Sequence, residues 1–246
     1  MNFTERIDAL EAQSLLIVAA LESGDPTAMV PTCPEFTLDR LAFHVGEFSG
    51  FWTHVVCEGT GRPKTPFPPD AEPGPARSRW VDALTTNLVV ELRSAEPDTP
   101  CWTWNDDDQS AGFIANRTCH ELTIHRVDLE LAASGRAGPV PTDVAIDGIE
   151  EVFLLVGEYG IDGERGTPGS GETLCLDASD HDAAWHIRLD PEAVSVTRGA
   201  AAADLTITAT VSDLEMLLYQ RPTAGKIDWI GDRGVLDVFH GEFTFS

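Results

Sequence analysis

The sequence has few basic side chains, and only two of them, Lys64 and Lys226, are lysines. Its 16 lysine and arginine residues stand against 41 acidic residues, which gives a formal net charge of −25 over 246 residues. Proteins bind nucleic acids and anionic lipid surfaces mainly through lysine and arginine. Because no local cluster of basic residues offsets the acidic excess, we expect neither a nucleic acid nor a membrane surface as a partner.

Long apolar runs are also missing. The longest of them, such as residues 15–21, are far shorter than the roughly 20 residues that span a bilayer. The N-terminal segment contains Glu5, Arg6 and Asp8 and lacks the apolar stretch of a secretory signal. The sequence therefore predicts a cytoplasmic protein.

Several cysteine and phosphate-binding motifs are absent as well. The five cysteines are an odd number, and no two of them form a CxxC pair. Without a secretory signal we expect reduced thiols, and we expect no cysteine-based zinc ribbon. The sequence has no GxGxxG or P-loop motif and no GxSxG nucleophile elbow, so it lacks the common nucleotide-binding and serine-hydrolase signatures.

Apolar residues recur at helical spacing in four segments of the first half. We expect helices over residues 5–23, 38–58, 76–95 and 110–133, with Thr37 as the cap of the second. Six prolines fall within residues 62–75, which indicates a connection. Four helices of this length predict an up-and-down bundle.

The pattern changes after Gly135, where glycine and proline cluster over residues 135–142. A helix over 143–159 and a glycine-rich loop over 160–171 are expected next. Short segments of strand character follow at residues 173–176, 185–189, 194–197 and 205–210. A last helix is expected at residues 212–219. We therefore predict an α+β fold with two domains, 1–138 and 139–246. The first is the bundle, and the second is a smaller α/β domain with an antiparallel sheet.

The fourth predicted helix carries an unusual polar stripe. Glu121 and His125 are four residues apart, so both project from one face of the helix, as two ligands of a single metal ion must. Asp128 follows three residues after His125, and Arg117 precedes Glu121 by four. Such a stripe on a helix that is otherwise buried is costly unless it has a partner.

A third ligand is expected from the second helix. His44 lies on the apolar stripe that should face the bundle interior. Two imidazoles and one carboxylate form a set that leaves a zinc-like ion one open position for water or substrate. From spacing alone, the alternatives are a surface ion pair between Glu121 and His125 and a buried core histidine at His44.

Other candidate ligands fit less well. His54 and Cys57 are three residues apart on the second helix but lie nearly three turns beyond His44. His120 is expected to point away from the polar stripe. The acidic run at residues 106–108 lacks the alternating ligands and the glycine of a calcium loop, so a solvated turn is expected there.

Three segments together carry a family resemblance. They are EFTLDRLAFH at residues 35–44, CWTW at 101–104 and HELTIHRVD at 120–128. With the order of the two domains, they resemble the mycothiol-dependent maleylpyruvate isomerase family over nearly the whole chain. The resemblance implies a DinB-like metal-binding bundle, followed by a C-terminal domain similar to sterol-carrier folds. It also implies a metal, typically zinc, held at His44, Glu121 and His125.

The resemblance further implies a thiol cofactor, either mycothiol or a similar small thiol. Its thiolate would add to the double bond of maleylpyruvate, allow rotation about the former double bond and then leave. Other DinB-like bundles keep the thiol adduct, so an isomerase and an S-transferase both remain open.

An anionic substrate needs a positive partner, and three arginines are candidates: Arg117, Arg79 and Arg221. The resemblance implies an arginine from the C-terminal domain, which Arg221 matches. We thus expect a monomer or homodimer that acts on a small electrophilic or anionic molecule. The alternative is a non-catalytic protein that keeps a metal and binds a small molecule or lipid, and a fourth protein ligand on the metal would favour it.

Overall fold

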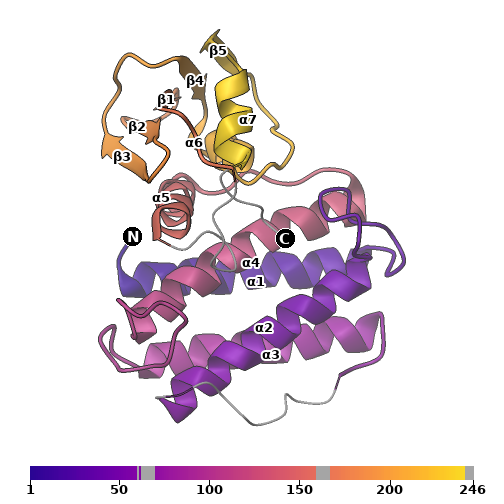
Figure 1. The fold of residues 1–246 in the computed structure, drawn as a ribbon. Coiled ribbons are helices and arrows are strands. Elements are labelled where there is room, and N and C mark those ends of the chain that lie inside the picture. The colour runs from indigo at the N-terminus through magenta and orange to yellow at the C-terminus, as the bar shows by residue number, and fades with distance from the viewer. Residues whose placement is uncertain (60, 62–69, 159–166, 242–246) are drawn as a thin grey trace. The chain divides into compact units, whose positions relative to one another are not determined.

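The protein consists of two compact units, Met1–Gly138 and Pro139–Ser246, in a computed structural model that describes residues 1–59, 61, 70–158 and 167–241 (Figure 1). The first unit is helical and the second contains a sheet, which confirms the predicted α+β class. Within the described ranges, no helix has the length and apolarity needed to cross a membrane. The proline-rich residues 62–75 and the glycine-rich residues 160–171 were predicted as connections, and both fall largely outside the description.

The first unit contains four long helices, α1 (Phe3–Ser23), α2 (Leu38–Glu58), α3 (Pro75–Ser94) and α4 (Ala111–Ser134). Side-chain caps set where α1, α2 and α4 begin, because these oxygens accept from backbone N–H groups that have no partner within the helix, whereas α3 begins with Pro75 and has no such cap. Thr37 caps α2 as predicted, and Ser110 caps α4. Asn2 caps α1 and forms a reciprocal capping box with Glu5.

Helices α2 and α3 run in the same direction. Near the start of both helices, the Arg77 side chain of α3 pairs with Asp39 of α2 at 3.1 Å. About one turn further along both helices, Trp80 stacks on Phe43 with ring centroids 5.8 Å apart. This differs from a simple up-and-down bundle, in which consecutive helices are antiparallel. The physical reason is the long segment between the two helices, because residues 59–74 are numerous enough to return along the length of α2.

Helices α1 and α4 are also parallel, because Arg126 of α4 donates to Gln13 at 3.0 Å and Gly24 lies beside Ala133. Each helix packs mainly on two others, α1 on α3 and α4, and α2 on α3 and α4. The apolar stripes of all four meet in one core, with Leu10, Leu41 and Leu88 fully buried. The predicted four-helix bundle is therefore present, but its order is up-down-down-up, with α3 and α4 both reversed relative to an up-and-down bundle.

The second unit begins with α5 (Thr142–Glu158). Its other elements are β1 (Glu172–Ala178), β2 (Ala184–Leu189), β3 (Val194–Arg198), β4 (Leu205–Ala209), α6 (Val211–Leu218), β5 (Asp228–Gly231) and α7 (Gly234–Gly241). The strands form one sheet in the order β3-β2-β1-β4-β5. The sequence did not predict β5 or α7.

The sheet is mixed, whereas the sequence predicted an antiparallel one. β1 and β4 are parallel, and the other neighbouring pairs are antiparallel. After β3, residues 199–204 carry the chain past β2 to the far side of β1, and His186 of β2 lies 3.2 Å from the Ala202 carbonyl oxygen. Because of this crossover, β4 enters the sheet in the same direction as β1.

Candidate metal centre

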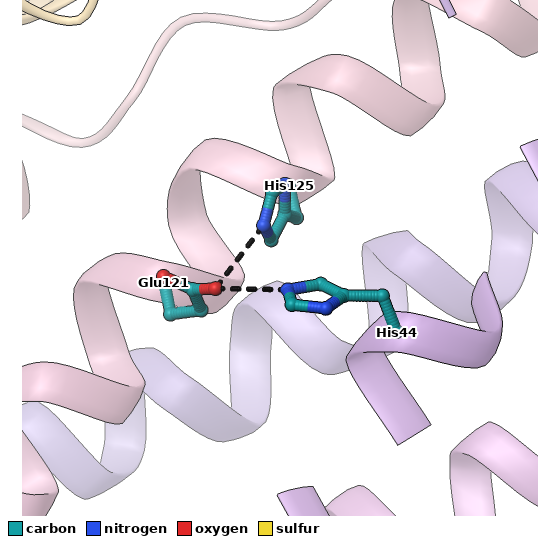
Figure 2. Close-up of side chains that lie close together, drawn as sticks. All are labelled: His44, Glu121 and His125. Carbon is teal, nitrogen blue, oxygen red and sulfur yellow. Dashed lines mark hydrogen bonds and ion pairs between the residues drawn. The ribbon is translucent and has the colours of Figure 1, made fainter. Parts of the chain in front are cut away.

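Three side chains meet where α2 faces α4. His44 projects from α2, and Glu121 and His125 project from adjacent turns of α4 (Figure 2). The Glu121 Oε1 atom lies 3.1 Å from His44 Nε2 and 3.2 Å from His125 Nε2. The two imidazole rings are edge to face, with centroids 5.1 Å apart. The structure thus brings together the three residues that the sequence proposed as ligands.

The donor set fits a small divalent cation. One nitrogen from each histidine and one carboxylate oxygen lie within 4.8 Å of one another. Around a tetrahedral zinc ion with bonds of about 2.0–2.1 Å, ligand atoms are separated by roughly 3.3 Å, so only small side-chain adjustments are needed. Over the described ranges, no other group of three histidine, cysteine or carboxylate side chains was found in such an arrangement.

Electrostatics tie the three groups together. Burial raises the pKa of Glu121, but the Arg117 guanidinium and the two histidines outweigh it and hold that pKa well below its ordinary value. Burial lowers the pKa of His125, but the Glu121 and Asp128 carboxylates outweigh it and raise the pKa to about 9. In the metal-free protein a proton on His125 therefore supplies positive charge beside Glu121.

The orientation of His125 is set by Asp128. Its Oδ2 atom lies 3.1 Å from His125 Nδ1, and its side chain is fully buried. A ring nitrogen that donates to a carboxylate leaves the opposite nitrogen to bind a metal, and such an outer contact is a regular feature of metal-binding histidines. Asp128 therefore directs His125 Nε2 toward Glu121 and His44.

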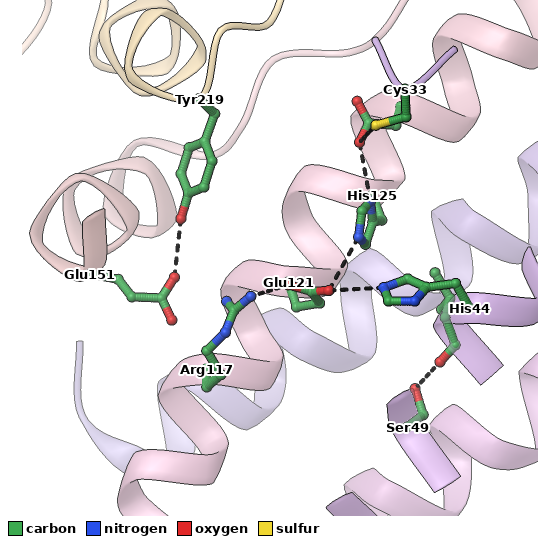
Figure 3. A network of polar contacts seen from close by, with 10 residues as sticks. Cys33, His44, Ser49, Arg117, Glu121, His125, Glu151 and Tyr219 are labelled. Atoms are coloured by element: carbon green, nitrogen blue, oxygen red, sulfur yellow. Dashed lines mark hydrogen bonds and ion pairs between the residues drawn. The ribbon is translucent and has the colours of Figure 1, made fainter. Parts of the chain in front are cut away.

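One side of the cluster is open and has aromatic walls. The His44 side chain is 40% exposed, and its ring lies 6.1 Å from that of Phe36 and 6.2 Å from that of Phe48. Arg117 lies over the Phe48 ring. It also pairs with Glu121 Oε2 (Figure 3). A molecule that reaches this cluster meets apolar rings and a guanidinium group.

The other two candidate arginines are on a different helix of the first unit and in the second unit. Arg79 is an exposed side chain of α3, and α3 packs on α1 and α2 rather than on α4. Arg221 belongs to the second unit, just after α6, where its Nη1 atom donates to the Tyr219 carbonyl oxygen at 2.8 Å. Of the three arginines, Arg117 is therefore the one that the first unit places at the cluster.

The alternative ligands have other surroundings. His54 pairs with Glu58 at 2.8 Å within α2. Burial and the neighbouring Glu91 carboxylate raise the pKa of the Cys57 thiol. His120 is fully buried on α4. The acidic run at residues 106–108 lies in the turn before α4, as expected, and its carboxylates are exposed.

Two residues that the sequence did not single out contact the cluster through Asp128. Thr32 donates its hydroxyl to Asp128 Oδ1 at 2.6 Å, and the Cys33 sulfur lies 3.8 Å from Oδ2. In the second unit, the sequence also missed a buried pair in which the Tyr219 hydroxyl donates to Glu151 at 3.1 Å (Figure 3). No periodicity links these residues to their partners, which lie 68 to 96 positions away.

Comparisons with known proteins identify a family and a similar fold. Residues 7–130 match the family model described as the mycothiol maleylpyruvate isomerase N-terminal domain. A crystal structure of the mycothiol-dependent maleylpyruvate isomerase aligns with a TM-score of 0.59 at 15% identity, covering 93% of both chains. A histidine-to-alanine mutant of that isomerase aligns with a TM-score of 0.54 at 14% identity, covering 88% of both. The search of curated proteins returned no match. The matched family model covers half of the sequence, and the chain therefore belongs to the mycothiol maleylpyruvate isomerase family.

Proposed function

We propose that this protein is a metal-dependent enzyme that uses mycothiol or a similar small thiol to isomerise a small electrophile or to transfer the thiol to it. One observation carries the proposal, namely the convergence of His44, Glu121 and His125 on one point between α2 and α4. This convergence occurs in a member of a family whose solved relative is described as mycothiol-dependent.

In this proposal, His44, Glu121 and His125 hold a divalent ion, with zinc as the expected metal. Three protein ligands are the number typical of catalytic zinc sites, whereas structural sites have four. When bound, the ion would stabilise a cofactor thiolate near neutral pH. The partial exposure of His44 supports access from solvent on that side.

The remaining residues have supporting roles. Asp128 fixes the tautomer of His125, so that Nε2 is free of a proton when the metal binds. Arg117 offers its guanidinium group to a substrate carboxylate, and its planar donors suit bidentate contact with such a group. Phe36 and Phe48 exclude water from the apolar part of the substrate. Arg221 is the candidate for a second arginine, from the second unit.

The two reactions differ in the fate of the thiol. An isomerase releases the thiol unchanged at the end of each turnover, whereas an S-transferase leaves it attached to the product. Product analysis with maleylpyruvate and with a neutral electrophile separates them. We propose a cytoplasmic location and a monomer or homodimer as the working form.

The test starts from metal content. The full chain, purified without chelator and exposed to zinc, is expected to hold about one ion per chain. His44→Ala and His125→Ala should lose the ion and the thiol-dependent activity. His54→Ala is the matched control, because it removes a histidine of α2 that pairs with Glu58 instead. A wild-type protein that binds no zinc contradicts the proposal, and a fourth protein ligand on the bound ion would favour a non-catalytic binding protein.

A further inference from the structure

The connection between α1 and α2 reaches the candidate metal centre through one buried carboxylate. Asp128 has no exposed side-chain surface, and its two oxygens face different partners. Oδ2 lies near His125 Nδ1, as described above, and Oδ1 accepts the Thr32 hydroxyl at 2.6 Å. A hydrogen bond to a charged carboxylate is stronger than one between neutral groups, and its short length here is typical of that class.

The connection that carries Thr32 is itself well fixed. Val30 is completely buried in the bundle core. The Val30 N–H donates to the Phe36 carbonyl oxygen at 3.0 Å, and the Leu38 N–H donates to that of Ala28 at 2.8 Å. These bonds close residues 28–38 into a compact loop whose tip carries Thr32. The hydroxyl is thus presented to Asp128 from a rigid segment, not from a freely moving one.

A carboxylate that orients a metal-binding histidine must itself be held in one orientation. A carboxylate held by a single contact can rotate about its χ angles, and its partner ring then rotates with it. With Oδ1 fixed by Thr32, only Oδ2 faces His125. The Cys33 sulfur lies 3.8 Å from Oδ2, a long and weak contact that adds little to this restraint.

We propose that Thr32 is a positioning residue of the metal centre, acting through Asp128 to hold His125 Nε2 in the direction of the ion. The proposal rests on the metal-binding function proposed above. It adds Thr32 to the site as a second residue of the α1–α2 connection, beside Phe36. Replacing the residue that contacts a metal-binding histidine typically weakens metal affinity about 10- to 100-fold. Thr32 acts on His125 through Asp128, so its loss is expected to weaken metal affinity by about tenfold, the lower end of that range.

The test measures the zinc dissociation constant of the full chain by competition with a chromophoric chelator, together with the visible absorption spectrum of the cobalt(II) form. Thr32→Val keeps the side-chain shape and removes the hydroxyl, so it should weaken zinc binding about tenfold and change the cobalt spectrum. Thr32→Ser keeps the hydroxyl and should match the wild type. Thr27→Val is the matched control, since Thr27 lies in the same connection and its hydroxyl donates to Asp25 at 2.8 Å, not to Asp128.

A double variant shows whether Thr32 acts through Asp128. Asp128→Asn should weaken zinc binding more than Thr32→Val, and adding Thr32→Val to Asp128→Asn should cause no further loss. A Thr32→Val protein with wild-type affinity overturns the proposal, and so does a further tenfold loss in the double variant. If Thr32→Val does not fold, Thr32→Ala repeats the test with a smaller side chain. A wild-type chain that binds no zinc contradicts the proposed function itself, which is a separate outcome.

Discussion

The Oε1 atom of Glu121 lies 3.1 Å from Nε2 of His44, which joins the middle of α4 to the first half of α2. The same oxygen lies 3.2 Å from His125 Nε2, so one carboxylate oxygen connects both histidines. Without a metal this arrangement needs a proton on a histidine, and in the proposed metal-bound form the ion would replace that proton. Glu121 is therefore the residue on which the metal-free form and the proposed metal-bound form both depend.

Replacing Glu121 by glutamine tests this dependence. The neutral amide oxygen is a poor ligand for zinc, so Glu121→Gln should weaken zinc binding by at least about 100-fold, beyond the range of outer contacts. Competition with a chromophoric chelator measures the change. Glu58→Gln removes a carboxylate that pairs with His54 four residues earlier on α2, and should leave zinc binding unchanged. Equal losses in both variants would show that general surface charge, not ligation, holds the ion.

The stability of the metal-free protein should depend on pH in a defined direction. The pKa of His125 is raised from 6.5 to about 9 in the folded protein, so folding is favoured by its bound proton. That contribution is complete below pH 6.5 and is lost as the pH rises toward 9. At about 1.4 kcal/mol per pKa unit, the loss is on the order of 3–4 kcal/mol. Denaturant unfolding of chelator-treated protein between pH 6 and 9.5 measures it.

A matched variant separates this effect from the rest of the chain. His125→Gln lacks the titrating group and should show a flatter profile across the same pH window. In zinc-loaded wild-type protein the fall in stability between pH 6.5 and 9 should be absent, because the ion would occupy the nitrogen that binds the proton. A slope that persists in His125→Gln would assign the pH dependence to other groups.

Much of the candidate site was predictable because it follows from helical geometry. Glu121 and His125 are four positions apart, which places them on one face of any helix. His44 interrupts an apolar stripe, so its direction toward the interior follows from the same periodicity. The spacing of Glu121 and His125 and the position of His44 on its stripe each depend on one helix alone. The three side chains meet because α2 packs against α4.

The features that sequence reasoning missed depend on long-range arrangement. Periodicity carries no information on the direction of a helix, so the parallel course of α2 and α3 was not foreseen. Thr32 lies 96 positions from Asp128 in a segment without regular spacing. Strand β5 has only 4 residues, and three of them are exposed, so it shows no alternation of apolar side chains.

The close approach of α2 and α3 can be tested at Gly46. A Cβ atom at this position would overlap with the Trp80 ring. Alanine favours a helix by about 1 kcal/mol over glycine, but overpacking costs about 1–3 kcal/mol, so Gly46→Ala should lower the free energy of unfolding by about 1 kcal/mol. Combining it with Trp80→Leu should remove the overlap and recover part of the loss. Chemical denaturation of the two single variants and the double variant measures the coupling.

Arg117 provides the test of substrate charge. Its guanidinium group lies over Phe48 and pairs with Glu121 Oε2, so it is already at the open side of the cluster. In Arg117→Met the apolar contact with Phe48 is kept and the charge is lost. Because hydrogen bonds to charged groups contribute about 1.5–3 kcal/mol, the KM of an anionic substrate should rise by about 10- to 100-fold. The KM of a neutral electrophile should change much less, and zinc content, measured in parallel, separates loss of substrate binding from loss of metal. An equal rise for both substrates would assign Arg117 to the support of Glu121 alone.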